Sequence, residues 1–442
     1  MKQSFVLTVS TGISAAGGFV AWSIAAHVAT PHAVGIAAGM FSSCALLSYL
    51  TNLALPYGLL RYGYSAGAPK ILRLALAATV ATSILGAVVF ALGSRLWAPA
   101  LASELGSPAT VATFVALNAG VAVAGLADAY FVAQRRAGLA CGRNTFVAIG
   151  KVGALIVLGR SGVPHASSIY LAMLVPVTLS TVCVSVPAAR TSRKVVQSED
   201  RHSSAAFMRF SLKNYPGALL DGAPSFLLPV LVFRLVGPTA NAYFYIAWSI
   251  SGVVALIAVA IGQVTLRESA TSDSQRTLAR RAMTLALVVT GIAVLTLSLA
   301  AGLVLHIFGS AYSGKAVLPV RLLLLSAVPG AYLTITTALL RGRKRYGAVN
   351  QAGIAYAGLS IGGAVGFGVI AGVNGACLGW LIGVSLAAGA IAVIVARQPS
   401  GGHHQIGIKR SRRKKLLDSR EAQCRGLDAA PVTHRRHRVP AL

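Results

Sequence analysis

Apolar residues occupy most of the chain in runs of about 20 residues, and short polar or Gly/Pro-containing gaps separate these runs. A helix of about 20 residues crosses the hydrocarbon core of a bilayer, which is about 30 Å thick. The runs lack the alternation of a membrane β-barrel, so we expect an all-α polytopic membrane protein. The pattern predicts twelve transmembrane helices, over residues 5–28, 33–60, 71–93, 109–134, 143–160, 168–190, 208–234, 239–266, 282–308, 318–341, 349–372 and 374–396.

Basic residues cluster before the first run and after every second run. All but six of the 39 Lys and Arg residues therefore lie on one side of the predicted bundle. Loops on the cytoplasmic side of membrane proteins are enriched in Lys and Arg, which predicts a plasma-membrane protein with both termini in the cytoplasm. Of the six exceptions, Lys151 lies inside a run, and the other five lie in the intervening gaps: Arg95, Arg160, Arg234, Lys315 and Arg321.

The composition agrees with a membrane protein and argues against nucleic-acid binding and against metal or cofactor sites. Only 11% of the 442 residues are charged, whereas soluble domains carry about 25%. The net charge of +29 follows mostly from the loop bias, and no folded nucleic-acid-binding module is recognisable, so we predict no nucleic-acid partner. The five cysteines follow no motif spacing, which argues against disulfides and metal sites, and no cofactor is predicted.

The spans divide into two sets of six around a polar linker. The turn Thr30–Ala33 resembles Gly237–Ala240 when the sequence is shifted by 207 residues, and both turns join the first two spans of a set. Because both sets start on the same side, we expect a parallel repeat. The predicted parts are an N-terminal half, a cytoplasmic linker, a C-terminal half and a basic tail, at residues 1–190, 191–207, 208–396 and 397–442.

The tail after residue 396 has the composition of a disordered segment. Each basic residue near an anionic membrane surface contributes about 1 kcal/mol of attraction. We therefore expect the tail to bind anionic lipids of the inner leaflet, either with a role of its own or as a simple topology anchor.

Asp128 and Lys151 are two of the three charged residues predicted deep within spans. They lie 11 residues before and 12 residues after residue 139, the expected centre of the loop between their helices. Equal depth makes an ion pair between them geometrically available. Two interpretations stay open: the pair holds the helices in register, or Lys151 faces a cavity and attracts an anionic substrate while Asp128 positions it.

Asp221 is the third deep charge, and it lies in the most proline-rich span of the chain. Prolines within a helix remove backbone hydrogen bonds, and interrupted helices at a repeat interface are common in transporters. Asp221 is therefore a candidate site for a proton, a cation or a sugar hydroxyl, with a purely structural acid as the alternative. Arg234, close to the outer end of the same span, either reaches the outer headgroups or lines an outward vestibule.

No catalytic motif is present in the sequence. It contains no Walker sequence, no HExxH and no GxSxG, so we expect neither ATP hydrolysis nor another enzymatic activity.

Three segments carry a family resemblance. Leu53–Tyr62 ends in Gly-Leu-Leu-Arg-Tyr, Leu227–Ala247 combines a long helix with a Gly-Pro turn and an aromatic restart, and Leu266–Ser269 reads Leu-Arg-Glu-Ser. Together with the twelve spans, they resemble the multidrug/oligosaccharidyl-lipid/polysaccharide (MOP) exporter superfamily, and within it the polysaccharide-flippase (Wzx-like) branch. The resemblance covers about residues 1–396 and excludes the tail.

The resemblance implies a V-shaped transporter that turns lipid-linked glycans from the inner to the outer leaflet. The partner would be a polyprenyl-pyrophosphate-linked glycan, typically on undecaprenyl pyrophosphate, and glycan-assembly enzymes are further candidate partners. A desolvated pyrophosphate needs a cation in the cleft. Lys151 is the candidate, and Arg61, Arg209 and Lys213 would form a collar at the cytoplasmic rim through which the substrate enters.

Two other functions are compatible with parts of the sequence. A drug or small-solute antiporter of the same fold would use several buried carboxylates, and only two acids lie deep in spans here. A membrane-embedded glycosyltransferase or glycan polymerase would need a large outer loop with acids, and Glu104 is the only acid predicted outside.

Overall fold

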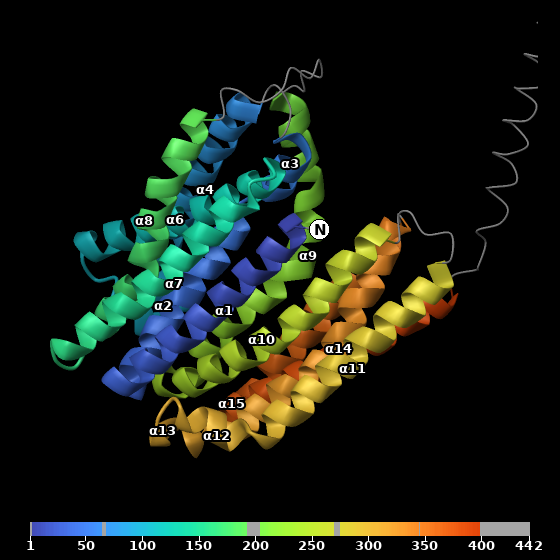
Figure 1. The fold of residues 1–442 in the computed structure, drawn as a ribbon. Helices are drawn as coiled ribbons and strands as arrows, with labels where there is room; N and C mark the ends of the chain where they lie inside the picture. The colour runs from blue at the N-terminus through green and yellow to red at the C-terminus, as the bar shows by residue number, and fades with distance from the viewer. Residues whose placement is uncertain (1, 64–67, 192–203, 269–274, 344, 398–442) are drawn as a thin grey trace, which may run out of the picture. The chain divides into compact units, whose positions relative to one another are not determined.

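The computed structural model describes residues 2–63, 68–191, 204–268, 275–343 and 345–397, and all regular secondary structure in these ranges is helical (Figure 1). Eleven helices there are long and apolar enough to cross a membrane. They are α1 (Lys2–Val28), α2 (Pro31–Thr51), α4 (Ala68–Trp97), α6 (Pro108–Ala133), α7 (Ala137–Arg160), α8 (Ala166–Thr191), α9 (Ser204–Val236), α10 (Pro238–Glu268), α11 (Gln275–Leu299), α14 (Val317–Gly342) and α15 (Tyr346–Arg397).

The last of these helices contains two membrane spans. Its 52 residues would extend about 78 Å as one straight helix, more than twice the thickness of a hydrocarbon core. The chain reverses at Ala371 and Gly372, where Gly372 has φ 59° and ψ −137°. A positive φ suits glycine because it has no Cβ. The expectation of twelve spans is therefore confirmed, with the last two at the predicted places.

The second predicted span is interrupted, in contrast to the single helix expected over residues 33–60. Leu53 and Ala54 have positive φ values of 48° and 55°, and the short helix α3 (Leu55–Tyr62) follows. A continuous helix would need Pro56 to donate a hydrogen bond to the carbonyl of Asn52, and proline has no N–H. The amide of Leu55 donates to this carbonyl instead, at 2.8 Å.

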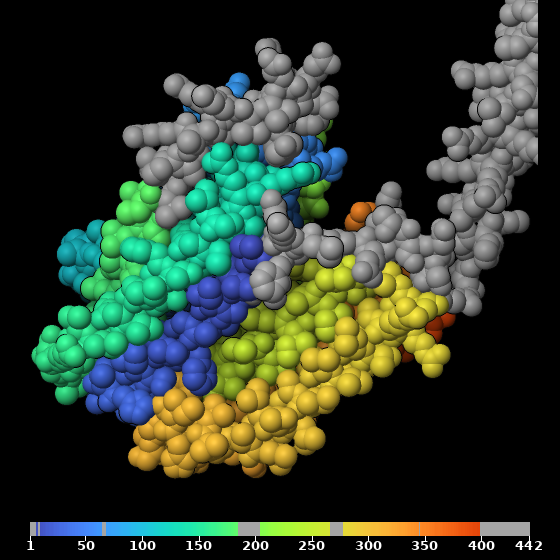
Figure 2. Space-filling model, in the orientation of Figure 1, coloured from blue at the N-terminus to red at the C-terminus, as the bar shows by residue number. Residues whose placement is uncertain are grey.

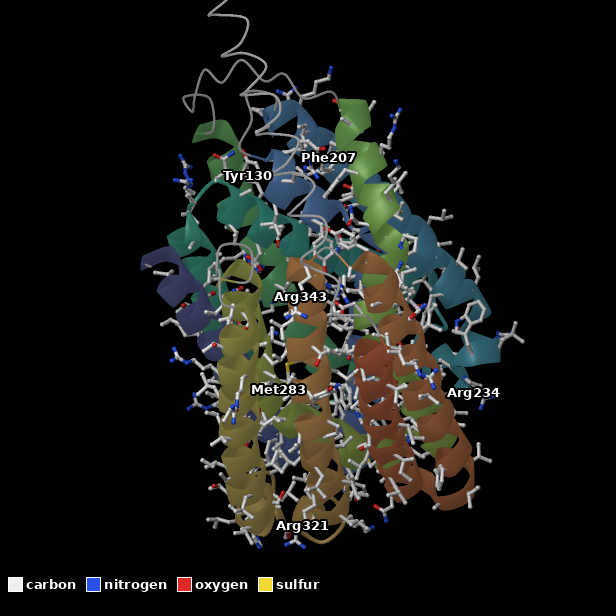
Figure 3. All side chains as sticks on the ribbon, turned by 90° about the vertical axis from the view of Figure 1, so that its right-hand side faces the viewer. Tyr130, Phe207, Arg234, Met283, Arg321 and Arg343 are labelled. Carbon is white, nitrogen blue, oxygen red and sulfur yellow. The ribbon has the colours of Figure 1, made fainter. Side chains whose placement is uncertain are left out.

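Three other short helices lie in the connections between long helices: α5 (Pro99–Ala102), α12 (Ala301–His306) and α13 (Ser310–Ser313). Figure 1 shows α12 and α13 at the opposite end of the bundle from α3. Arg343, which follows α14, and Arg321, near its start, lie at opposite ends of that helix (Figure 3). We call the end at which the basic clusters lie the inner end, and the opposite one the outer end.

The two turns that resemble each other in sequence meet at the outer end. Thr30 caps α2, and Gly237, with φ 77°, precedes α10. The side-chain amide of Asn241 donates to the carbonyl of Gly35 at 3.0 Å. A Cβ on Gly35 would collide with the carbonyl oxygen of Pro238, so the backbones touch there. This contact fits the expected parallel repeat and closes the outer end between α2 and α10.

Residues Met1–Ala392 form one compact unit by their contacts. Within it, α1 packs mainly on α7 and also touches α10, so that α1 lies between these two helices (Figure 2). The contacts between the predicted halves are made chiefly by α2 with α9 and α10. The division into four parts remains a prediction, and most of the linker and of the tail lies outside the described residues.

The two segments of α15 pack on each other through glycines. Cβ atoms on Gly379 and Gly383 would collide with the backbone oxygens of Gly363 and Leu359. Small residues at four-residue spacing allow such close approach of helices in a membrane, where van der Waals packing drives their association.

We expect Gly379→Ala to destabilise the protein by about 1–3 kcal/mol, because the added methyl group forces these segments apart. The measurement is the thermal denaturation midpoint of the purified protein in detergent. Gly389→Ala is the matched control, since a Cβ at Gly389 has no neighbour within 4 Å. Equal midpoints for the two variants would contradict the packing argument.

Candidate functional site

A cavity of about 920 Å³ lies against α9, α10, α14 and α15, with α2 and α3 on one side. The predicted N-terminal half contributes only four of its lining residues: Phe41, Ser42, Ala45 and Tyr57. The cavity is thus built mainly by the predicted C-terminal half.

This cavity extends toward the inner end of the bundle. Its lining includes Arg341, at the last turn of α14, and Asn350, in the second turn of α15. On α10 the lining begins only at Tyr245, seven residues after the helix starts. Since α2 and α10 meet at the outer end, the cavity is closer to the inner end of the bundle.

An ion pair between Asp221 of α9 and Arg341 of α14 lies in the cavity wall. A guanidinium nitrogen of Arg341 is 3.0 Å from a carboxylate oxygen of Asp221, and the two side chains are 36% and 44% exposed. Among the described residues that line the cavity, these two are the only charged ones. The paired charges cancel, and both remain accessible from the cavity.

Sequence reasoning missed Arg341 because it belongs to a basic cluster that the topology already explains. Its position within the last turn of a span, two residues before Arg343, is the one available signal. Asp221 lies in the cavity wall, and its candidate role stays a prediction; sequence reasoning assigned it no partner. α9 itself is one continuous helix through Pro216, Pro224 and Pro229.

A cluster of aromatic side chains contributes to the wall. Trp380 packs edge-on against Trp248, with ring centroids 5.3 Å apart, and against Tyr356 at 5.9 Å. The hydroxyl of Tyr356 shares a hydrogen bond of 3.3 Å with that of Ser225. Aromatic rings with polar tips offer both apolar faces and hydrogen-bonding groups to a ligand.

Asp128 does not pair with Lys151; its partner is Arg143. The Nε of Arg143 donates to Asp128 at 3.0 Å, and the second guanidinium contact completes a bidentate ion pair. Arg143 also donates to Asn144, whose side-chain amide donates to Ser10 of α1 at 2.9 Å. The network connects α6, α7 and α1, and it therefore holds these three helices together.

Asp128 has a different partner from the predicted one because the turn between α6 and α7 lies earlier in the sequence than expected. α6 ends at Ala133 and α7 begins at Ala137, so the turn is centred near Arg135 and not near residue 139. About this centre, Asp128 and Arg143 lie seven and eight residues away, at equal depth. Lys151 lies two turns deeper, beyond the reach of Asp128.

Lys151 lies close to the cavity without lining it. Its ammonium group is 5.6 Å from the ring centroid of Phe41, and Phe41 is part of the cavity wall. In the part of the chain that the structure describes, neither of the two ion pairs includes Lys151. A cation near the middle of a span that is stabilised by a cation–π contact and by no ion pair is energetically costly.

We expect Lys151→Met to stabilise the protein by about 1–3 kcal/mol, because an uncompensated charge at the centre of a span costs about 2.5–3.5 kcal/mol on insertion scales. If the cation serves transport, the same variant should transport at least about ten-fold more slowly. The two measurements are the denaturation midpoint in detergent and the transport rate in proteoliposomes. A variant with unchanged stability and full transport would exclude a role for this charge.

The remaining predicted site residues lie outside the cavity wall. Arg61 places its guanidinium 4.6 Å from the ring centroid of Phe210, at the inner end between α3 and α9. Arg209 and Lys213 are exposed on the first turns of α9. All three lie toward the inner end of the bundle, no contact unites them as one site, and the collar stays a prediction. Arg234 lines a separate groove.

The solved structures to which the chain is similar include membrane transporters. The chain resembles a multidrug resistance MATE family transporter of the MOP superfamily in its inward-facing conformation, with 17% identity, a TM-score of 0.61 and coverage of 90% of this chain and 96% of that one. An outward-facing structure of such a transporter gives 15% identity, a TM-score of 0.55 and coverage of 88% and 93%.

A third similar structure is a MOP superfamily transporter from Pyrococcus furiosus, described by a reversed polarity of its binding pocket that suggests a different function. It has 15% identity and a TM-score of 0.57 and covers 88% of this chain and 93% of that one. No protein-family model matches the sequence, and neither does any curated protein. The chain therefore has the fold of the MATE transporters, and at these identities the likeness extends to the fold alone.

Proposed function

We propose that this protein carries polyprenyl-pyrophosphate-linked glycans from the cytoplasmic to the outer leaflet by alternating access. The supporting observation is Arg341, a cation in the wall of a large cavity near the inner end, with Asp221 as its one ion-pair partner among the described residues. An anionic headgroup that enters from the cytoplasmic side meets this cation first.

The chemistry of the headgroup explains the need for such a cation. A pyrophosphate removed from water loses a large hydration energy, which charge-assisted hydrogen bonds from a guanidinium partly restore. Arg341 can exchange Asp221 for a phosphate oxygen because both side chains reach the cavity. Lys151, behind Phe41, is a second cation on the N-terminal side that the headgroup would approach when the halves rearrange.

The aromatic wall suits the glycan. Sugars present C–H groups on one face and hydroxyls at the edges, and they pack on aromatic faces while hydrogen-bonding to polar tips. Trp248 and Tyr356 line the cavity beside Ser225, and the buried Trp380 packs edge-on against both.

A cation-coupled antiporter of drugs or small solutes is the second candidate, because the fold is shared with multidrug transporters and aromatic walls also attract organic cations. Such a substrate is best held by free carboxylates. The cavity wall has one carboxylate, and it is paired with Arg341, so an organic cation would have to displace that guanidinium.

The test is reconstitution of the full chain into proteoliposomes. A lipid-linked oligosaccharide is placed in both leaflets, and its exposure to an external lectin is followed after the outer pool has been blocked. We expect renewed exposure that depends on the protein, and no proton-driven efflux of ethidium. Ethidium efflux without glycan translocation would favour the antiporter and overturn the proposal.

A further inference from the structure

A second groove, of about 580 Å³, runs between α2, α4 and α9, and it shares no lining residue with the central cavity. Its wall is almost wholly apolar. It includes Leu46, Leu50, Leu85, Val89, Leu227 and Leu231.

The groove opens on the surface of the bundle. Leu85 and Val89 of α4 line it and are 65% and 51% exposed. In a membrane this surface faces hydrocarbon, so lipid chains and not water fill the opening.

The length of the groove matches a lipid chain. On α4 the lining extends from Thr82 to Trp97, about 22 Å at 1.5 Å per residue. A chain that starts at the outer interface and follows this path passes the middle of the hydrocarbon core, which lies about 15 Å deep. Trp97, near the outer end of α4, has the position of an interfacial aromatic residue.

Among the described residues that line the groove, the one with a charge, Arg234, lies at its outer end. Arg234 is in the last turn of α9, and it is exposed at the flank of the bundle (Figure 3). Neither of the ion pairs in the described part of the chain includes it. A guanidinium at the outer interface above an apolar groove is complementary to a lipid with a phosphate headgroup and no compensating amine.

We propose that this groove is a binding site for an anionic phospholipid of the outer leaflet, with its phosphate at Arg234 and one acyl chain between α4 and α9. The walls come from both predicted halves, α2 and α4 from the N-terminal one and α9 from the C-terminal one. A lipid bound there therefore bridges the two halves. The site does not depend on the identity of the transported substrate.

The test is native mass spectrometry of the full chain in detergent, titrated with phosphatidylglycerol or phosphatidylethanolamine. We expect one tightly retained phosphatidylglycerol and weaker retention of phosphatidylethanolamine. Arg234→Gln should weaken phosphatidylglycerol binding about five-fold, because one basic residue near an anionic lipid contributes about 1 kcal/mol. Leu231→Trp should also lower retention by filling the groove while Arg234 is kept.

Arg95→Gln is the matched control, since Arg95 is an exposed outer cation of α4 that does not line the groove. Equal retention of the two phospholipids, or equal weakening by Arg95→Gln and Arg234→Gln, would overturn the proposal. Preferential retention of polyprenyl phosphate over phosphatidylglycerol would overturn it as well, because the groove would then hold the lipid carrier. None of these outcomes depends on a transport assay, so they are separable from failure of the proposed function.

Discussion

Arg341→Gln should lower glycan translocation about ten- to hundred-fold, because a hydrogen bond to a charged group contributes about 1.5–3 kcal/mol that the neutral amide largely loses. The cavity keeps its size in this variant, while its one cation disappears. The measurement is the initial rate of lectin exposure in proteoliposomes, with protein content and orientation matched between samples. The denaturation midpoint should change little, since both partners of the ion pair are well exposed.

The control for Arg341 is its neighbour Arg343, which caps the same helix, is exposed and does not line the cavity. Arg343→Gln should transport at the wild-type rate. Asp221→Asn frees Arg341 from its partner, so headgroup binding should be tighter and release slower. A loss of transport shared equally by the Arg341 and Arg343 variants would point to general surface charge and contradict a cavity role.

Arg143→Met should destabilise the protein by about 3 kcal/mol, the lower end of the range for removing one member of a buried ion pair. Arg143 is 5% exposed, and its side chain fills the space between α6 and α7. Asp128 is 34% exposed, so its carboxylate remains partly solvated without its partner, which limits the loss of stability. The effect is measured as the shift of the denaturation midpoint and as the yield of monodisperse protein in detergent.

Two variants separate the ion pair from the loss of side-chain volume. The exchange Asp128→Arg with Arg143→Asp should recover most of the stability lost in either single variant, because the two positions lie at equal depth. Arg160→Met, at the exposed outer end of the same helix, should leave the midpoint nearly unchanged. Recovery on exchanging Asp128 with Lys151 would instead contradict the observed pairing.

The helices were largely predictable because the hydrophobic pattern is strong and continuous. Residues 5–28, 208–234 and 239–266 fall within α1, α9 and α10. The break at Leu53 and Ala54 was not predicted, although Pro56 provides its physical cause. Pro56, two residues past the break, removes one backbone hydrogen bond, and each of the three prolines within α9 does the same without interrupting that helix. Packing of α3 on α9 and α6 decides between these outcomes.

The candidate site was only partly predictable. Asp221 was recognisable because an acid within a span raises the free energy of insertion, and such residues usually serve function or pair with another group. Arg341 was not, since a basic residue at the inner end of a span is already explained by topology. The wrong partner was predicted for Asp128 because the fifth span was expected to begin at residue 143, whereas α7 begins six residues earlier, at Ala137. Six residues correspond to about 9 Å along a helix axis.

Sequence by itself determined the spanning segments, because burying apolar runs in a bilayer leaves few alternatives, and it predicted their orientation from the distribution of 39 basic residues. Tertiary structure decided which charges meet. Asp128 joins Arg143, Asp221 joins Arg341, and Lys151 stands beside Phe41. Hydropathy is summed along one helix, whereas an ion pair or a cavity depends on the rotation, depth and contact of several helices, and no local pattern encodes these.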